Sequence, residues 1–163
     1  MQALMMNTQL MISSILKHAE KNFPDVEMVS VTVDNPRHRQ NYKTFAKRSR
    51  QLANVLESLG AKFGDRVGTL AWNDFRHMEL YYAVSGSGMV CHTINPRLFP
   101  EQVAYIINHA EDKILFVDVL VMPLLEALQA HLSKVETIVI LTDKAHMPES
   151  TLPNVLCYEE ILE

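Results

Sequence analysis

From about residue 44 onward, short apolar runs alternate with stretches in which apolar residues recur every three or four positions. Runs of four to eight apolar residues are typical of buried strands, and the stretches between them predict helices. Strands that alternate with helices form right-handed crossovers within one sheet. The pattern therefore predicts an α/β fold with a mostly parallel sheet covered by helices on both faces. The expected strands are 65–72, 89–94, 113–118, 137–141 and a shorter fifth run, 155–158.

Cap residues place the helices between these strands. Thr44 is the expected N-cap of the first of them, because a threonine hydroxyl can accept from an otherwise unpaired backbone N–H. Gly60 follows its last apolar residue as a left-handed stop, and Asn73-Asp74 can cap the next helix. The expected helices are 44–59, 73–86, 100–110 and 120–132, and residues 158–162 resemble the first turn of another.

The first third of the chain has a different pattern. Residues 28–33 alternate as a strand, Asp34-Asn35-Pro36 breaks it, and 41–43 can return antiparallel, which predicts a small hairpin. Before it, an apolar stripe along residues 10–19 predicts a methionine-rich helix. Such a helix can cover its own domain, bind a partner's groove or lie on a membrane surface.

Composition limits the classes of protein that fit. The chain has 163 residues, enough for one domain, and its 48% hydrophobic and 21% charged residues are ordinary for a globular protein. A net charge of -4 argues against a nucleic-acid binder. The basic residues between Arg37 and Arg50 are interpreted as a solvated hairpin tip and an outer helix face.

Cysteine usage and the N-terminus concern the compartment. Cys91 and Cys157 lie far apart inside apolar runs, which favours buried free thiols in a reducing cytoplasm. No apolar stretch approaches the ~18 residues of a membrane span. The first residues lack a basic leader and a small-residue cleavage site, so no secretory signal is expected.

A phosphate-binding loop should lie between the end of a strand and the start of a helix. Gly86 and Gly88 follow a helix instead, which indicates a tight turn. Asn95-Pro96-Arg97 has the required position, and Arg97 could pair with phosphate. Pro96 nevertheless offers no N–H, so this loop is interpreted as a structural joint.

Metal and nucleophile patterns are also absent. The seven histidines form no i, i+4 pair on a predicted helix, and no G-x-S-x-G motif occurs. Cys91 and its neighbour His92 should point to opposite faces of the sheet. His92 is expected to be a hydrogen-bonded core residue. The residues themselves therefore predict no catalytic, cofactor-binding or metal-binding position.

One pattern is similar to another class of protein, the receiver domains of two-component signalling. Asp118 ends a predicted strand, and Thr142-Asp143-Lys144 ends the next one. This alternative makes Asp118 a phosphoacceptor. Its register departs from the receiver pattern, because the Met-Pro pair follows one residue late and Ala145 stands where a proline is normal.

A closer resemblance covers almost the whole chain. Several segments occur in the order and spacing of the N-terminal part of adenylate-forming acyl-CoA synthetases, and they most resemble the medium- and long-chain fatty-acid members. Phe99 departs from the Ser or Thr that is usual before the Pro-Glu pair, so the helix cap there should be weak, and Gln9 stands where proline is frequent. The matching segments are Gly64-Asp65-Arg66-Val67, Asn73, 92–98, Pro100-Glu101-Gln102, 106–110 and Asp118.

The resemblance implies a chemistry for a parent protein. Members of this family join a carboxylate to Mg-ATP to form an acyl-adenylate, which CoA then converts into a thioester. ATP, Mg²⁺, CoA and a fatty acid are therefore the expected cofactors and substrates of the parent. The family's phosphate loop, metal-binding glutamate, ribose-binding aspartate and catalytic lysine have no matching motif in this chain.

Residues 1–163 are accordingly expected to be a fragment, an N-terminal subdomain that is inactive alone and binds none of these cofactors tightly. A stand-alone interaction domain is the remaining alternative. Self-association through uncovered sheet surfaces and peripheral contact with a membrane are further expectations.

Overall fold

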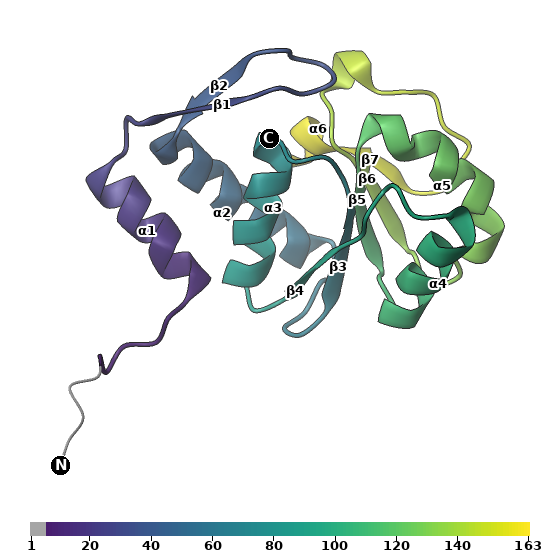
Figure 1. The fold of residues 1–163 in the computed structure, drawn as a ribbon, viewed down its shortest axis with the longest axis horizontal. Coiled ribbons are helices and arrows are strands. Elements are labelled where there is room, and N and C mark those ends of the chain that lie inside the picture. The colour runs from purple at the N-terminus through teal and green to yellow at the C-terminus, as the bar shows by residue number, and fades with distance from the viewer. Residues whose placement is uncertain (1–5) are drawn as a thin grey trace.

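The computed structural model describes residues 6–163, and its centre is a five-stranded sheet (Figure 1). The strand order is β4-β3-β5-β6-β7, and every neighbouring pair is parallel. The predicted parallel sheet is therefore confirmed, including its short fifth strand. The strands are β3 (Arg66–Leu70), β4 (Val90–Thr93), β5 (Ile114–Val117), β6 (Thr137–Ile140) and β7 (Val155–Cys157).

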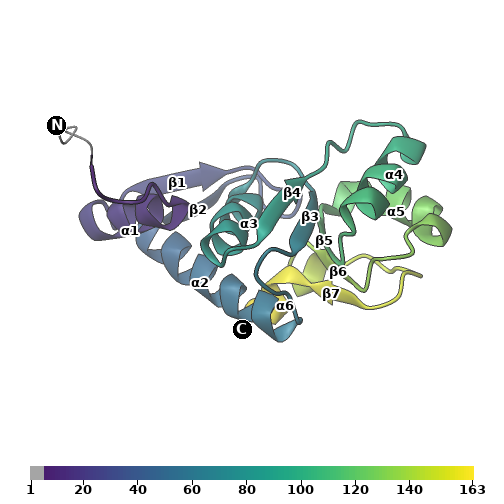
Figure 2. The same cartoon turned by 90° about the horizontal axis from the view of Figure 1, so that it is seen from below.

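Helices cover both faces of this sheet (Figure 2). On one face lie α2 (Tyr42–Ser58), α3 (Phe75–Gly86) and the short α6 (Tyr158–Leu162), and on the other lie α4 (Pro100–Ala110) and α5 (Met122–Leu128). Two apolar cores result, one on each side. An outer helix, α1 (Ile12–Asn22), packs against α2 and α3 and buries none of its residues fully.

The period of two along β5 shows how one strand supplies both cores. Ile114 and Phe116 belong to the core under α2 and α3, whereas Leu115 and Val117 belong to the core under α4 and α5. All four side chains are buried, with at most 5% of their surface exposed. A strand buried on both faces reads as a continuous apolar run, and this is why the sequence revealed it.

The first strand of the hairpin ends earlier than the predicted 28–33, and the return strand is 38–41, whereas the prediction placed it at 41–43, where α2 already begins. β1 (Glu27–Ser30) pairs antiparallel with β2 (His38–Asn41), which forms a separate two-stranded sheet. The N-cap of α2 is Asn41, whose side-chain oxygen accepts from the Thr44 N–H at 2.9 Å. The prediction of Thr44 as the cap was wrong, because asparagine is a strong cap residue and stands one turn earlier.

The predicted helix 120–132 is also interrupted. Two short 3₁₀ turns, η1 (Val119–Val121) and η2 (Gln129–His131), flank the seven-residue α5. Pro123 lies in the first turn of α5, where its missing N–H breaks no bond, but it cannot donate to a preceding helical turn. The proline therefore sets where the α-helix begins.

Other local predictions hold. Asp74 caps α3, and Gly60 adopts a positive φ of 86° beyond the end of α2. Gly88 lies in a tight turn with φ 77°. The cap of α4 is weak as expected: Phe99 offers no side-chain acceptor, and only the reciprocal bond from its N–H to Gln102 Oε1 is present, at 3.2 Å.

Large exposed apolar side chains are concentrated near the start of the described chain. On α1 and just before it, Met11, Ile12 and Ile15 expose about half of their surface. Along β1 and its continuation, Val29, Val31 and Val33 all face solvent. None of the helices within residues 6–163 has the length and apolar character needed to cross a bilayer.

Substitution of one glycine should test how closely β3 packs. A Cβ at Gly68 would lie 2.4 Å from Cδ2 of the buried Leu115 and 3.1 Å from the Asp112 carboxyl. We expect Gly68→Ala to lower the free energy of unfolding by roughly 1–3 kcal/mol, the usual effect of overpacking. The matched control is Gly86→Ala at the end of α3, where a Cβ meets nothing within 4 Å. Urea unfolding of both variants checks this, and equal stabilities would contradict the packing described.

Candidate functional site

Open α/β sheets usually bind ligands at the carboxyl ends of their strands, next to the point where the strand order reverses. Here that point lies between β3 and β5. Three aspartates follow the strands on this edge. Each one accepts a backbone N–H at 2.9 Å: Asp74 from His77, Asp118 from Leu120 and Asp143 from His146. The three carboxylates therefore serve as caps of the helical turns that begin there.

Two of these carboxylates are in an unfavourable electrostatic environment. Burial raises the pKa of Asp74, and the nearby Asp118 carboxylate adds to this rise. Burial also raises the pKa of Asp118, against the opposing effects of the Leu120 N–H and the Arg76 charge. Several carboxylates thus lie close together at this edge of the sheet. The positively charged Arg76 guanidinium lies near the carboxylates of Asp74 and Asp118.

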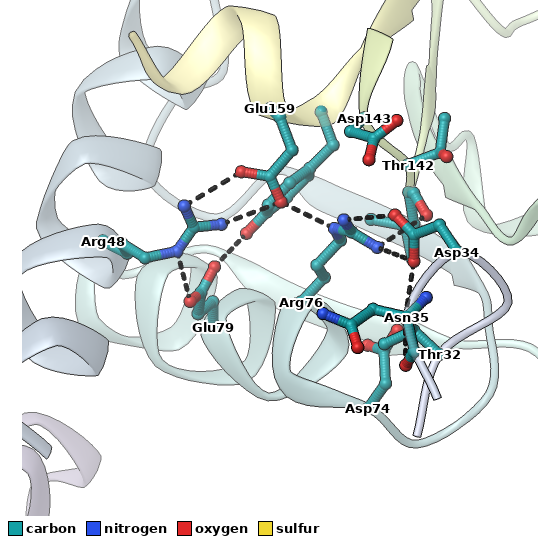
Figure 3. Close-up of polar contacts among 12 residues, drawn as sticks. Thr32, Asp34, Asn35, Arg48, Asp74, Arg76, Glu79, Thr142, Asp143 and Glu159 are labelled. Carbon is teal, nitrogen blue, oxygen red and sulfur yellow. Dashed lines mark hydrogen bonds and ion pairs between the residues drawn. The ribbon is translucent and has the colours of Figure 1, made fainter. Parts of the chain in front are cut away.

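The hairpin tip covers this edge. Asp34, in the turn between β1 and β2, pairs with both terminal nitrogens of Arg76, with Oδ1–Nη1 3.1 Å and Oδ2–Nη2 2.7 Å (Figure 3). Arg76 also donates to the Leu141 carbonyl at the end of β6, at 3.3 Å. Burial acts to raise the pKa of Asp34, but hydrogen bonds from Arg76 and Thr32 outweigh it and hold this pKa well below its usual range.

Behind Arg76, the polar contacts continue into the protein. The Arg76 Nε donates to Glu159 at 2.7 Å, and Glu159 accepts two further bonds from Arg48 at 2.9 and 3.1 Å. Arg48 Nε donates to Glu79 at 2.7 Å, and the Tyr158 hydroxyl donates to the other oxygen of Glu79, also at 2.7 Å. We call the six residues Asp34, Arg48, Arg76, Glu79, Tyr158 and Glu159 the ion network.

The ion network joins four elements: the hairpin tip, α2, α3 and α6. Arg76 and Glu79 lie three positions apart on α3, so they project from the same side of the helix. The Glu79 side chain is 0% exposed and the Arg76 side chain is 5% exposed. In Figure 3 the acids and bases alternate from Arg48 to Asp34, so each charge faces an opposite one.

Burial and pairing act in opposite directions on the acids and bases of this network. Burial raises the pKa of Glu79, and the partial compensation comes from Arg48 and from the Tyr158 hydroxyl. Burial acts to lower the pKa of Arg48, but Glu79 and Glu159 together raise it above its ordinary value. Burial, reinforced by the Glu79 charge, raises the pKa of Tyr158 far above its ordinary value. Arg48 therefore stays charged and Tyr158 stays a hydrogen-bond donor at neutral pH.

The sequence did not reveal this network. Arg48 was assigned to a solvated face of its helix, and that assignment was wrong, because its side chain is only 20% exposed and lies among carboxylates. Arg76 and Glu79 were not singled out at all. The signal was present as two opposite charges at i and i+3 on a helix that is otherwise apolar on most sides. Glu159, the carboxylate that Arg48 and Arg76 share, lies 83 or more residues from either arginine in the chain, so sequence spacing could not identify it.

The polar groups of the loop Asn95-Pro96-Arg97 form hydrogen bonds within the loop itself. The Arg97 N–H donates to Asn95 Oδ1 at 2.9 Å, and the Leu98 N–H donates to the Asn95 carbonyl at 3.3 Å. The Arg97 guanidinium lies 5.1 Å from the centre of the Trp72 ring. This geometry agrees with a structural joint between β4 and α4.

Cys91 and His92 show no arrangement for nucleophilic catalysis. His92 Nδ1 lies 2.7 Å from Oδ2 of the fully buried Asp112, which confirms the predicted hydrogen bond. The prediction that His92 is a core residue was wrong, because its side chain is 23% exposed at the edge strand β4. Burial raises the pKa of Cys91 to about 11. This thiol is therefore protonated at neutral pH and a poor nucleophile.

One group of possible metal ligands occurs within the described part of the chain. Asp34, Asp143 and His146 place ligand atoms within 4.8 Å of one another. Asp34 is already bound by Arg76 on both oxygens, and Asp143 lies 2.7 Å from His146 Nδ1. Because Arg76 already occupies both oxygens of Asp34, and Asp143 already contacts His146, the group offers little to a cation.

A hollow of about 510 Å³ lies at the opposite edge of the sheet, where β3, β5 and β6 begin. Its charged side chains are balanced between acids and bases, and Arg66 within it is already held by Glu111 at 3.4 Å. This is the amino end of the strands, which open α/β sheets seldom use for ligands. The lining residues are Asp65, Arg66, Glu111, Lys113, Ser133, Lys134 and Glu136.

Removal of one buried charge should destabilise the fold far more than removal of an exposed one. Arg76→Met leaves the Asp34 carboxylate buried without its partner, so we expect the free energy of unfolding to fall by roughly 3–5 kcal/mol. The matched control is Arg39→Met, which breaks the exposed pair with Glu27 and should change it by less than about 1 kcal/mol. Chemical denaturation of the two variants measures both values. Similar losses would show that the network is no more stabilising than a surface ion pair.

Acid should weaken the contribution of Asp34. Its folded-state pKa lies below the unfolded value of about 3.9, so its carboxylate stabilises the folded state above about pH 5, and this contribution is lost as pH falls below 4. The stability difference between the native chain and Asp34→Asn should therefore be about 1 kcal/mol smaller at pH 3 than at pH 6. Asp25→Asn, at an exposed position before β1, is the control. A difference that does not change with pH would refute the assigned pairing.

The chain is similar to known proteins in sequence and in fold. The family model described as AMP-binding enzyme matches residues 16–159. A 3-methylmercaptopropionyl-CoA ligase of Ruegeria lacuscaerulensis is 44% identical over 98% of this chain and 30% of its own length. A long-chain-fatty-acid–CoA ligase of Thermus thermophilus is 44% identical over 97% of this chain and 28% of its own length.

Solved structures agree on the fold. The fatty acyl CoA synthetase of Mycobacterium tuberculosis superimposes with a TM-score of 0.68 at 22% identity, over 93% of this chain and 28% of that one. The chain thus spans about 30% of the length of the curated relatives that it matches. Because the family model covers most of its residues, the chain belongs to the AMP-binding enzyme family.

Proposed function

We propose that this chain is the N-terminal subdomain of an AMP-forming acyl-CoA ligase that activates a medium- or long-chain fatty acid or a related acid. The observation that carries the proposal is the family match over residues 16–159, together with 44% identity to two acyl-CoA ligases. The parent enzyme would use ATP, Mg²⁺ and CoA to make a thioester by way of an acyl-adenylate.

Within that enzyme, we assign a scaffolding role to residues 1–163. The carboxyl edge of the sheet, where a nucleotide would be sought first, carries helix caps and a charge network that is closed on itself. The adenylation chemistry would then come from parts of the ligase outside this chain. The chain alone is accordingly expected to be inactive and to bind ATP weakly at most.

The alternatives drawn from the sequence have less support than the ligase assignment. A phosphoacceptor role for Asp118 has no support, because its side chain is only 6% exposed and caps the turn after β5. A stand-alone interaction domain is likewise unsupported by the relatives, which are CoA ligases. Free thiols at the half-buried Cys91 and the buried Cys157 fit a reducing compartment such as the cytoplasm.

Exposed apolar residues on and near α1 and β1 are the basis of our expectation that the chain associates with itself or with a membrane. Ile12 and Ile15 on α1, Val29 on β1 and Val31 just after it are all exposed apolar side chains. We infer that isolated 163-residue chains self-associate at high concentration, and that the same surface could touch a membrane. Sedimentation velocity across a concentration series, with and without lipid vesicles, would measure each of these associations separately.

A chimera should test the assignment to a ligase. Residues 1–163 would replace the matching segment of the Thermus thermophilus ligase, which is 44% identical over 158 residues. We expect the purified chimera to release pyrophosphate from ATP in the presence of a long-chain fatty acid, because the scaffold is interchangeable within a family. The 163-residue chain alone should release none.

Two chimeric variants serve as controls. Arg39→Met, at an exposed ion pair, should leave the activity unchanged, whereas Arg76→Met should reduce the yield of folded, active enzyme. A chimera that is folded by circular dichroism yet forms no acyl-adenylate would refute the proposal. Pyrophosphate release by the 163-residue chain alone would refute the scaffolding role.

A further inference from the structure

The β1–β2 hairpin spans the carboxyl edge of the sheet and makes unusually little contact with it. We define the strap as residues 27–41, which comprise β1, the tip and β2. In Figure 1 it extends from the region above α2 and α3 toward the loop after β6. Its tip thereby lies over the reversal point between β3 and β5, where Asp34 meets Arg76.

Very little apolar surface holds the strap closed. Gln40 is the only residue among 27–41 that is buried as a whole, and the Asp34 side chain is 5% exposed, so both buried groups of the strap are polar. The outward face of the first strand carries Val29, Val31 and Val33, which are 53–73% exposed. Hydrophobic stabilisation scales with the apolar area that is buried, so it contributes little here. A hairpin of two strands is also marginally stable without further support.

Polar atoms beneath the strap oppose its closure. Both amide atoms of Gln40 and Nε2 of His38 are buried and have no hydrogen-bond partner among residues 6–163. A buried polar group without a partner costs its full desolvation energy. The favourable contact on this underside is the stacking of His38 on Phe75, with ring centres 3.6 Å apart.

The two ends of the strap differ in how they are attached. Its base is continuous with α2 and is fixed by backbone bonds from Tyr42 to Val26 at 3.2 Å and from Lys43 to Pro24 at 3.0 Å. Its tip is held by the two-pronged pair between Asp34 and Arg76. A carboxylate–guanidinium pair of this geometry is among the stronger polar contacts in proteins. Most of the favourable energy of closure is therefore at the tip.

The strength of this tip contact depends on the rest of the ion network. Arg76 is oriented by Glu159 through its Nε at 2.7 Å, and Glu159 is oriented by Arg48. The guanidinium stays in place when the strap leaves, because α3 and α6 still hold it. Opening would thus uncover a preformed guanidinium at the reversal point of the sheet without disturbing the core.

From these contacts we propose that the strap opens as a unit, well before the protein unfolds, and that the Asp34–Arg76 pair is its latch. The base of the hairpin is the hinge, and the two apolar cores remain intact in the open form. The latch is independent of the ligase assignment, because it concerns contacts within residues 27–159 alone.

Hydrogen exchange with mass spectrometry tests the latch on the 163-residue chain at constant pH. In the native chain, the opening that lets amides of residues 27–30 and 38–41 exchange should cost less free energy than the opening that lets amides of β3 and β5 exchange. Exchange in 27–30 and 38–41 should also depend less on added denaturant, since less surface is exposed. Equal exchange and equal denaturant dependence in the two regions would overturn the proposal without the need for any variant.

Variants then test the role of the tip. Asp34→Asn keeps the size of the side chain and removes its charge, so we expect exchange in 27–30 and 38–41 to rise at least about tenfold. Because the pair exists only in the closed form, exchange of β3 and β5 through global unfolding should rise by a similar factor, while the strap keeps its smaller opening free energy and its lower denaturant dependence. Asp25→Asn, an exposed position just before the strap, should leave both regions unchanged.

The same variants define the results that would overturn the latch. No increase in Asp34→Asn would mean that the pair does not hold the strap. The same opening free energy and the same denaturant dependence for the strap and for β3 and β5 in Asp34→Asn would mean that the hairpin opens only together with the whole protein. Glu159→Gln adds a test of orientation: it touches no strap residue other than through Arg76, so it should accelerate exchange of the strap less than Asp34→Asn does, and a larger effect would contradict the latch.

Discussion

The Arg76 guanidinium is the contact on which the arrangement of the outer elements depends. It is bound on one side by Asp34 from the hairpin and on another by Glu159 from α6, while its own helix, α3, packs on the sheet. A single buried cation thereby joins the beginning, the middle and the end of the described chain. Taking charges out of water is costly, so such a cation persists only where carboxylates surround it with good geometry. This condition fixes the relative positions of the hairpin tip, α3 and α6.

The same condition explains why the carboxyl edge of this sheet is a scaffold. In many open α/β proteins this edge offers unpaired N–H groups and free charges to a ligand. Here Asp74, Asp118 and Asp143 take up the N–H groups of the turns that follow them, and Asp34 takes up the guanidinium. In the framework of an acyl-CoA ligase, such an edge would position other parts of the enzyme and leave the nucleotide to them.

How much of the structure could be predicted from the sequence depended on how far apart in the chain the interacting residues lie. Periodicity identified every strand of the main sheet, because β5 and its neighbours are continuous apolar runs between turn residues. Local chemistry located Asp74 and Gly60 correctly but placed the start of α2 at Thr44, since two good cap residues compete within one turn. The interruption of the predicted helix 120–132 near Pro123 could have been predicted from the proline itself. The ion network was not, because Arg48, Glu79 and Glu159 look like ordinary surface charges until the fold brings them together.

The most direct test of the central claim is a calorimetric titration of the folded 163-residue chain with Mg-ATP. The account places no nucleotide site in residues 1–163, so it predicts no saturable heat of binding at millimolar ATP, while a complete ligase of the family gives a saturable isotherm under the same conditions. Saturable binding of Mg-ATP by the chain alone, lost on substitution of a residue within it, would contradict the account and place a nucleotide site where we find only scaffold.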